Sequence, residues 1–442
     1  MYLPDSILTC IQMLEQAGFV AYVVGGCVRD ACLGLIPQDY DMCTSALPEQ
    51  TEEVFQDYRL VLAGKKHGTI GVVTEDGVVE ITTFRTEGEY RDNRHPDWVA
   101  FVPDVEQDLA RRDFTVNAMA WSPARGYADP FGGREDLKKG ILRAVGDPVK
   151  RFQEDSLRIL RGLRFASRYQ LAIDADTWAA MEQEKMRLGN LARERVFEEL
   201  CKFLCSVTTA RELVAYAPVL AAVIPELEPM IGFDQRSPHH AYDVFTHTAH
   251  VVTGVSADLD RRWAALLHDV GKVPTFTMDG TGRGHFYGHA HASAEIAETI
   301  LLRLKAPADL RKKVVFLIDN HMTKLEPDKK LLRRRLHQYG WECVSDLLAL
   351  QWADFSGKGV REKGPDFDRI DELLTEIYQD KPCLSLKDLA VKGNDLMALG
   401  FAGKTIGQTL NILLDQVLDE QLPNEKAALL SFLQAQIKEK TV

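Results

Sequence analysis

Near the N-terminus the chain reads Val23-Val24-Gly25-Gly26-Cys27-Val28-Arg29-Asp30. The apolar run predicts a strand, the two glycines predict a tight turn, and the residues after them predict the start of a helix. Backbone N–H groups and the helix dipole at such a turn suit a triphosphate. Since a strand, a glycine turn and a helix are common together, the neighbouring motifs must decide what this one indicates.

Two aspartates follow closely, in Pro37-Gln38-Asp39-Tyr40-Asp41. On a strand, residues i and i+2 point to the same face, so Asp39 and Asp41 are expected to lie together and to hold Mg²⁺. Glu80 lies in a β-branched, interior-looking run and is the third candidate acid. Nucleotidyl transfer needs such cations because negative charge builds up on the transferring phosphorus and the leaving pyrophosphate. A surface turn is the alternative for an isolated pair of aspartates.

Two charged motifs come next, Arg111-Arg112-Asp113-Phe114-Thr115-Val116-Asn117-Ala118 and Glu154-Asp155-Ser156-Leu157-Arg158, with Arg161 one turn later. Helical spacing predicts that Asp155 and Arg158 lie together and that Arg161 lies beside Arg158. A carboxylate and a guanidinium can present an acceptor and donors to a base, and so select C and A without a template. An intrahelical ion pair is the alternative.

Taken in order, these motifs resemble those of the class II tRNA nucleotidyltransferases, CCA-adding members of the polymerase-β-like superfamily. The resemblance implies template-independent addition of CCA to tRNA from CTP and ATP, with Asp39, Asp41 and Glu80 as catalytic residues. It assigns nucleotide binding to Gly25, Gly26, Arg29, Arg112, Asp113, Asn117, Glu154, Asp155, Arg158 and Arg161. The polar loop Arg85–Pro96 resembles the loop that switches complete enzymes from C to A addition. A poly(A) polymerase, or an enzyme adding only CC or only A, remains the alternative within this class.

A second constellation lies in the other half of the chain, in the order His247, His268-Asp269 and Asp354, with His289 and His321 between. Imidazole and carboxylate ligands suit Mn, Fe, Ni, Co or Zn, and such a metal suits phosphoester hydrolysis. The set resembles the HD phosphohydrolase superfamily, with His289 and His321 holding a second metal, although His291 leaves the ligand at 289 ambiguous. An HD phosphohydrolase with an RNA-binding head is therefore the alternative from another class.

The strand-like runs end near residue 125 and helical spacing dominates after about residue 135, which predicts an α+β fold. We expect a small mixed-sheet, polymerase-β-like head at 1–130 and an all-helical neck at 131–200. A helical body at 201–375, with the HD domain at about 240–360, and a helical tail at 376–442 complete the division. The tail is expected to bind tRNA, although helix capping explains its glycines equally well.

The net charge of -12 over 442 residues excludes a protein that coats nucleic acid by bulk electrostatics, so RNA contacts must be local. Candidate basic stretches are Arg158–Arg168, Arg311–Lys313 and Lys329–Arg335, and a solvated helix face is the alternative for the last two. The eight cysteines include no Cys-x-x-Cys pair, which fits a reducing cytoplasm. No apolar run is long enough for a membrane span.

Overall fold

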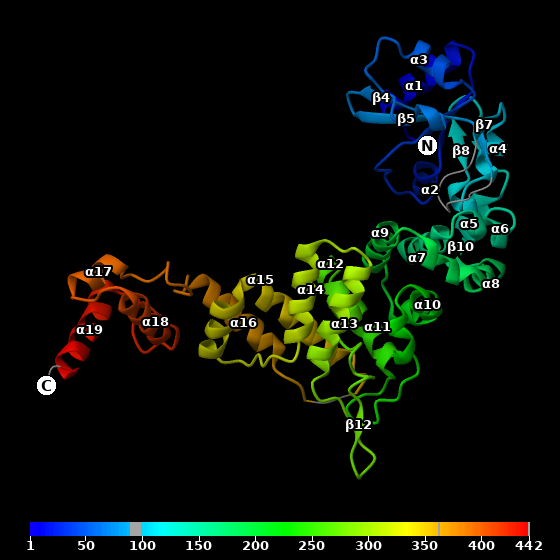
Figure 1. The fold of residues 1–442 in the computed structure, drawn as a ribbon. Coiled ribbons are helices and arrows are strands. Elements are labelled where there is room, and N and C mark those ends of the chain that lie inside the picture. The colour runs from blue at the N-terminus through cyan, green and yellow to red at the C-terminus, as the bar shows by residue number, and fades with distance from the viewer. Residues whose placement is uncertain (89–98, 361–362, 441–442) are drawn as a thin grey trace. The chain divides into compact units, whose positions relative to one another are not determined.

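The computed structural model describes residues 1–88, 99–360 and 363–440 (Figure 1). The chain divides into two compact units, the first comprising Met1–Pro229 with Ile300–Pro307 and the second Met230–Thr299 with Ala308–Val442. The four-part division expected from the motifs is finer than this and stays a prediction. Most of the predicted switching loop, residues 89–96, lies outside the described residues.

A mixed sheet of seven strands, in the order β3-β4-β5-β2-β1-β8-β9, forms the centre of the N-terminal part of the first unit. β2 and β5 are parallel, whereas the other neighbouring strands are antiparallel. The strands are β1 (Ala21–Val24), β2 (Met42–Thr44), β3 (Leu60–Val61), β4 (Thr69–Thr74), β5 (Gly77–Thr83), β8 (Ala120–Ser122) and β9 (Gly126–Ala128).

The apolar sequence of β1 explains its place within the sheet. All four of its residues are buried, and it pairs with β2 on one side and β8 on the other. Tyr22 and Val24 pack with Phe84 and Leu109 in one core cluster. The strand ends at Gly25, whose φ of 78° turns the chain into α2. The predicted strand, glycine turn and helix are therefore confirmed.

Helices surround this sheet and continue the first unit. They are α1 (Asp5–Gln16), α2 (Gly26–Cys32), α3 (Pro48–Val54), α4 (Val105–Ala110), α5 (Gly133–Lys139), α6 (Pro148–Glu154), α7 (Leu157–Tyr169), α8 (Ala175–Glu184), α9 (Arg193–Leu204) and α10 (Ala210–Val223). Two short ladders pair β6 (Arg85–Glu87) with β7 (Val99–Phe101) and β10 (Ile141–Leu142) with β11 (Ala172–Ile173). The 3₁₀ helices are η1 (Lys65–His67), η2 (Thr115–Asn117), η3 (Lys185–Asn190) and η4 (Pro225–Met230).

A break between α6 and α7 falls inside the predicted Glu154–Arg158 motif. The Asp147 side chain accepts hydrogen bonds from the backbone N–H groups of Val149 and Lys150, and so starts α6. Asp155 then adopts extended angles, φ -141° and ψ 102°, and ends the helix. Because α7 begins only at Leu157, the motif does not lie on one helix as its spacing predicts.

The rest of the chain is helical apart from the hairpin of β12 (Thr277–Met278) and β13 (Gly284–His285). Its helices are α11 (Val244–Gly254), α12 (Leu259–Leu267), α13 (His289–Arg303), α14 (Ala308–Asn320), α15 (Lys329–Ser356), α16 (Phe367–Gln379), α17 (Gly393–Ala398), α18 (Lys404–Leu418) and α19 (Lys426–Lys440). Aspartate side chains cap α11 and α12 at their N-termini. Gly340 breaks α15 with a φ of 78°.

The last three helices enclose a small core of their own, which includes Leu396, Leu413 and Leu429. In the part of the chain that the structure describes, every helix is too short or too polar to cross a membrane. The α+β prediction, a mixed sheet followed by helices, is confirmed.

Candidate active sites

One cavity of about 620 Å³ in the first unit is lined by most of the predicted nucleotide site. The predicted residues that line it are Gly25, Gly26, Arg29, Asp39, Asp41, Arg112, Asp113, Asn117, Asp155, Arg158 and Arg161. We call it the nucleotide cleft. Glu80 lines an adjoining cavity of about 570 Å³ together with Asp39 and Asp41. The aspartates therefore face both cavities, while the third acid faces one.

The glycine turn lies directly against an arginine of the cleft. The Gly25 N–H donates to the Met119 carbonyl at 2.9 Å, which fixes the turn against the residues after η2. A Cβ atom built on Gly25 would lie 2.8 Å from Nη1 of Arg112. The positive φ therefore requires glycine at position 25, and a Cβ atom there would make the end of the Arg112 side chain move.

The acids lie differently from the prediction in two respects. Asp39 and Asp41 come before β2, which begins at Met42, so they lie in the loop that enters the strand and not on it. Glu80 is exposed, because the buried face of β5 is formed by Val79, Ile81 and Thr83; its predicted interior position is wrong. The register pairs Met42 with Ile81, so one residue back along these parallel strands Asp41 comes beside Glu80.

The electrostatics of Asp41 fit a cation at this position. Desolvation by the surrounding protein raises the pKa of Asp41, the Arg112 guanidinium opposes that rise, and the carboxylates of Glu80 and Asp39 add to it. A divalent cation would relieve this repulsion between like charges. Among the described residues the ligand atoms of Asp39, Asp41 and Glu80 do not all lie within 4.8 Å of one another.

Asp113 is buried at the back of the cleft and ionised. Its Oδ2 accepts from Nε and Nη2 of Arg161 at 2.9 and 2.6 Å, and its Oδ1 accepts from Nδ2 of Asn117 at 3.0 Å. Burial alone would raise the pKa of Asp113, but Arg161, Asn117 and Arg158 together lower it to about 2. Asp113 therefore offers only acceptors to a ligand in the cleft.

The Glu154–Arg158 motif pairs in a different way from the one predicted. Nη1 of Arg158 donates to Oε2 of Glu154 at 2.6 Å. Asp155 instead accepts from Nη2 of Arg195, on α9, at 2.9 Å. Asp155 and Arg158 both line the cleft, and the Asp155 carboxylate also accepts from the backbone N–H of Leu157 at the start of α7. Arg195 also lines the cleft and was missed, since nothing in its local sequence shows where α9 packs.

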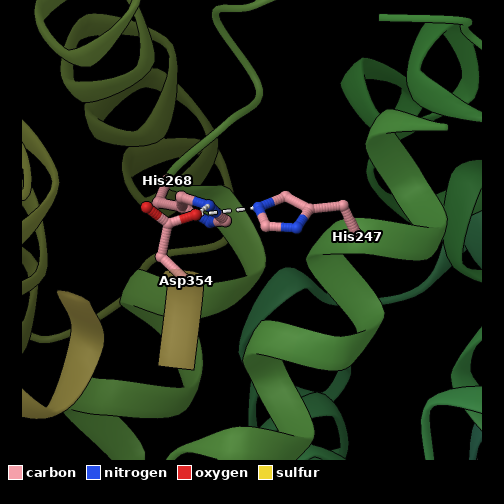
Figure 2. Close-up of side chains that lie close together, drawn as sticks. All are labelled: His247, His268 and Asp354. Atoms are coloured by element: carbon pink, nitrogen blue, oxygen red, sulfur yellow. Dashed lines mark hydrogen bonds and ion pairs between the residues drawn. The ribbon is translucent and has the colours of Figure 1, made fainter. Parts of the chain in front are cut away.

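The second constellation converges in the second unit. Figure 2 shows His247 from α11, His268 after the end of α12 and Asp354 from α15 pointing toward one another. Nε2 of His247 lies 2.9 Å from Oδ1 of Asp354 and 3.4 Å from Oδ2 of Asp269. Two sets have ligand atoms all within 4.8 Å of one another, His247-His268-Asp354 and Asp269-His289-His321. We call these six residues the His-Asp cluster.

The histidine rings of this cluster share one orientation. Nδ1 of His247, His268, His289 and His321 lies 2.6 to 3.1 Å from a backbone carbonyl oxygen, and therefore carries the proton. Each Nε2 then points into the cluster, and burial lowers the pKa values of His289 and His321, so that these two rings are neutral and their Nε2 atoms carry lone pairs. Nε2 of His289 lies 3.2 Å from Nε2 of His321, two acceptors facing each other with no proton between them. Carbonyl-oriented imidazoles of this kind are typical of metal ligands.

The charge of the cluster is also that of a cation site. Burial would raise the pKa values of Asp269 and Asp354, but the neighbouring histidines and, for Asp269, Lys272 hold them below their ordinary range. Burial also lowers the pKa of His321 to about 4, which keeps that ring neutral. His291, by contrast, is exposed and pairs with Asp319 at 3.1 Å, so His289 is the residue that joins the cluster.

Basic side chains in the two basic stretches of the second unit form ion pairs with acidic side chains of the same unit. Lys313 pairs with Asp260 at 2.8 Å and Arg311 with Glu298 at 2.9 Å. Arg334 and Lys330 both pair with Asp419, at 2.7 and 3.0 Å. These charges therefore join α15 to α18 and α14 to its neighbours, and the RNA-binding interpretation of the two stretches stays a prediction.

Comparison with protein families covers both halves of the chain. Residues 21–143 match the "Poly A polymerase head domain". Residues 170–231 match the "Probable RNA and SrmB- binding site of polymerase A", and residues 286–433 match the tRNA nucleotidyltransferase domain 2. A head of this kind, with acids and arginines around one cleft, defines the chain as a nucleotidyltransferase.

Relatives extend the match to the full length. The CCA-adding enzyme of Bacillus velezensis is 32% identical over 422 residues, 95% of each chain, and that of Streptococcus mutans is 33% identical over 441 residues, 99% of each. The crystal structure of the Bacillus stearothermophilus CCA-adding enzyme in complex with CTP has a TM-score of 0.72 at 28% identity and covers 100% of both chains. The chain belongs to the family of class II CCA-adding enzymes.

Proposed function

We propose that this protein adds C, C and A in turn to the 3′ ends of tRNA, using CTP and ATP and no nucleic-acid template. One observation carries the proposal: Asp39 and Asp41 line the same cleft as Asp113, Asp155 and Arg158. A single bound nucleotide can therefore meet the acids that serve phosphoryl chemistry and the pair that reads its base. The family membership supports the same activity.

The chain's own residues divide the work. Asp39 and Asp41 would hold Mg²⁺, which when bound neutralises charge on the triphosphate, and Glu80 would assist at the primer hydroxyl. Asp113 accepts from the ribose, and Arg112 and Arg161 face the phosphates. Arg29 and Asn117 are expected to bind nucleotide as well, although in the structure their side chains donate to and accept from protein groups.

Base selection would depend on two side chains, Asp155 and Arg158, each of which is oriented by a different neighbouring residue. Arg195 fixes Asp155, and Glu154 fixes Arg158, so neither needs the other to keep its orientation. Asp155 then offers an acceptor, and Arg158 offers donors, to the Watson–Crick edge of a base. C and A each carry an exocyclic amino group, which U lacks, so an acceptor at this position favours them.

The test uses tRNA transcripts ending at the discriminator base, at C and at CC, incubated with Mg²⁺ and CTP, ATP or both. Resolved at single nucleotides, the products should be two Cs and then one A, with no further addition. A long A tail would instead identify a poly(A) polymerase, and addition of only C or only A a partial enzyme. No addition at all would refute the proposal.

A second function is favoured by the His-Asp cluster. We propose that it is an HD-type phosphohydrolase centre, with His247, His268, Asp269 and Asp354 as ligands and His289 and His321 holding a second metal. The facing Nε2 atoms of His289 and His321 support this, because a cation between them would replace a repulsion by two bonds. The ligands suit Mn, Fe, Ni, Co or Zn, and the metal would polarise a phosphoester for hydrolysis.

The hydrolytic function is tested by metal analysis of the purified protein and by hydrolysis of bis(p-nitrophenyl) phosphate after reloading with each of these metals. Bound metal together with metal-dependent hydrolysis is expected. A protein that binds none of them would refute the proposal. The cytoplasmic location and the tRNA-binding role of the tail stay predictions.

A further inference from the structure

Six side chains beside the nucleotide cleft form a closed ring of contacts: Arg29, Asn117, Asp113, Arg161, Phe165 and Tyr169. Nη2 of Arg29 donates to the hydroxyl of Tyr169 at 2.5 Å, and Nη1 of Arg29 donates to Oδ1 of Asn117. Nδ2 of Asn117 donates to Asp113 at 3.0 Å, and Arg161 donates to the other carboxylate oxygen. Tyr169, the last residue of α7, is thus connected to Asp113 by a hydrogen-bonded path.

The path has only one possible direction. The Arg29 guanidinium can only donate, and the ionised Asp113 can only accept. Asn117 carries one acceptor and one donor group, so its amide must turn Oδ1 to Arg29 and Nδ2 to Asp113. Oδ1 of Asp113 also accepts from the backbone N–H of Phe114 at 2.8 Å, so a movement of Arg29 changes one of the two donors to this oxygen.

Aromatic contacts close the ring on its other side. The guanidinium carbon of Arg29 lies 4.2 Å from the centroid of the Tyr169 ring. Tyr169 and Phe165 stack with centroids 6.3 Å apart and an interplanar angle of 27°. The guanidinium carbon of Arg161 lies 5.2 Å from the Phe165 centroid. Both arginines of the ring therefore lie over aromatic side chains of one face of α7.

Asp113 has little freedom left by these contacts. Each carboxylate oxygen already accepts from the protein, Oδ1 from Asn117 and the backbone N–H of Phe114, and Oδ2 from Arg161. A ligand hydroxyl can use only a remaining lone pair, whose direction depends on how the carboxylate plane is held. Arg29 itself is buried, with 5% of its surface exposed, and Oδ1 of Asp30 also accepts from its Nε and Nη2, at 2.9 and 2.7 Å.

We propose that Tyr169 is a positioning residue for sugar recognition: through Arg29 and Asn117 it sets the orientation of Asp113, and so the preference for ribonucleotides over deoxyribonucleotides. The inference rests on the proposed nucleotide addition, in which Asp113 meets the ribose. Tyr169 does not line the cleft itself and touches no substrate. Its effect passes through its hydroxyl and its ring, which contact Arg29 together with Asp30.

The test compares Tyr169→Phe with the wild-type protein in the addition of CTP and dCTP to a tRNA transcript ending at the discriminator base. The substitution keeps the ring and removes one hydrogen bond to a charged group, so the ratio of kcat/KM for CTP to that for dCTP should fall about tenfold. The change should appear mainly in KM for CTP. An unaltered melting temperature would show that the fold is intact.

Tyr127→Phe is the matched control. Tyr127 also carries an arginine on its ring, with the carbon of Arg134 4.2 Å from the centroid, but it lines a different cavity. Its CTP to dCTP ratio should equal that of the wild type. A second variant, Asn117→Asp, places an acid against Asp113 and should lower the ratio further than Tyr169→Phe.

The outcomes separate this inference from the proposed function. A wild-type protein that adds no nucleotide refutes the proposed function. In that case, calorimetric measurement of the affinities for CTP and dCTP still gives the sugar preference of each variant. A wild-type protein that adds CTP, with a ratio unchanged in Tyr169→Phe, overturns the positioning role. An equal loss in Tyr127→Phe would also overturn it, because the effect would then be unspecific.

Discussion

Asp155 shows how one side chain of the cleft depends on a residue forty positions away. Its Oδ1 accepts from the backbone N–H of Leu157 at 3.0 Å, and its Oδ2 accepts from Arg195 at 2.9 Å. The first contact fixes the start of α7, and the second fixes the direction of the carboxylate. In the proposed mechanism we therefore expect Arg195 to influence base selection, although it is not part of the Glu154–Arg158 motif.

Arg195→Ala should relax base selection. With Arg195 gone, Asp155 keeps only its backbone contact and can rotate, so incorporation of UTP relative to CTP should rise about tenfold, the value of one charged hydrogen bond. The measurement is the rate of each nucleotide's addition to a tRNA transcript ending at the discriminator base. Arg193→Ala is the control, because Arg193 lies on the same helix and donates to the Gly189 carbonyl. Equal effects of the two variants would contradict the assignment.

Asp113 should give the protein a pH-dependent share of its stability. Its pKa falls from an ordinary 3.8 to about 2 on folding, so its contribution is complete above about pH 4 and is lost as the pH falls toward 2. At 1.36 kcal/mol for each pKa unit, this contribution is about 2 kcal/mol. Urea unfolding of the wild type should therefore lose about 2 kcal/mol more than Asp113→Asn over this range. Parallel pH curves would show that Asp113 is not stabilised by its partners.

At the scale of elements, the turn between β1 and α2 lies directly against the end of the Arg112 side chain. Gly25→Ala should destabilise the protein by about 1–3 kcal/mol through its positive φ and should also displace Arg112 from the cleft. Gly34→Ala is the control, since Gly34 has a φ of 72° and no atom within 4 Å of an added Cβ. Both variants should lower the melting temperature, but only Gly25→Ala should lower nucleotide incorporation. A comparable loss of incorporation in Gly34→Ala would mean that backbone strain alone is responsible.

The sequence predicted correctly those elements that local residues determine. Its predictions were wrong where the packing of distant elements determines the position of a side chain. The strand, glycine turn and helix at 23–30 carry their own turn chemistry, and the residues of the cleft follow from ordered motifs. The positions of Asp155 and Glu80 could not be predicted in this way. Asp147 and Pro148 start a short helix that ends before the Glu154–Arg158 motif does, and the register of β5 directs Glu80 to its exposed face. Arg195 became visible only when the packing of α9 against α7 was known.

At the scale of the whole molecule, several basic side chains of each unit form ion pairs with acidic side chains of the same unit. Arg161, Arg164 and Arg158 pair with Asp113, Glu199 and Glu154, and Arg334 pairs with Asp419. These pairs and the net charge of -12 reduce the release of counterions from RNA that clustered basic groups would otherwise produce. The affinity for tRNA should therefore fall only modestly with salt. A steep decrease in a salt titration, as for strongly basic RNA-binding proteins, would contradict this.

The two sites lie in different compact units, so the two proposed activities should be separable by mutation. Asp39→Ala with Asp41→Ala removes the acids of the cleft and should abolish CCA addition while sparing hydrolysis of bis(p-nitrophenyl) phosphate. His268→Ala removes a buried ligand of the His-Asp cluster and should abolish hydrolysis and lower the metal content, while CCA addition continues. Removing the metal with a chelator and reloading it should restore hydrolysis in the double aspartate variant but not in His268→Ala.

If the double aspartate variant still adds nucleotides, Asp39 and Asp41 are not the catalytic acids. If His268→Ala still hydrolyses the diester with wild-type metal content, the cluster is not the hydrolytic centre. Because each variant is scored on both activities, a general failure to fold would remove both and cannot be mistaken for either result.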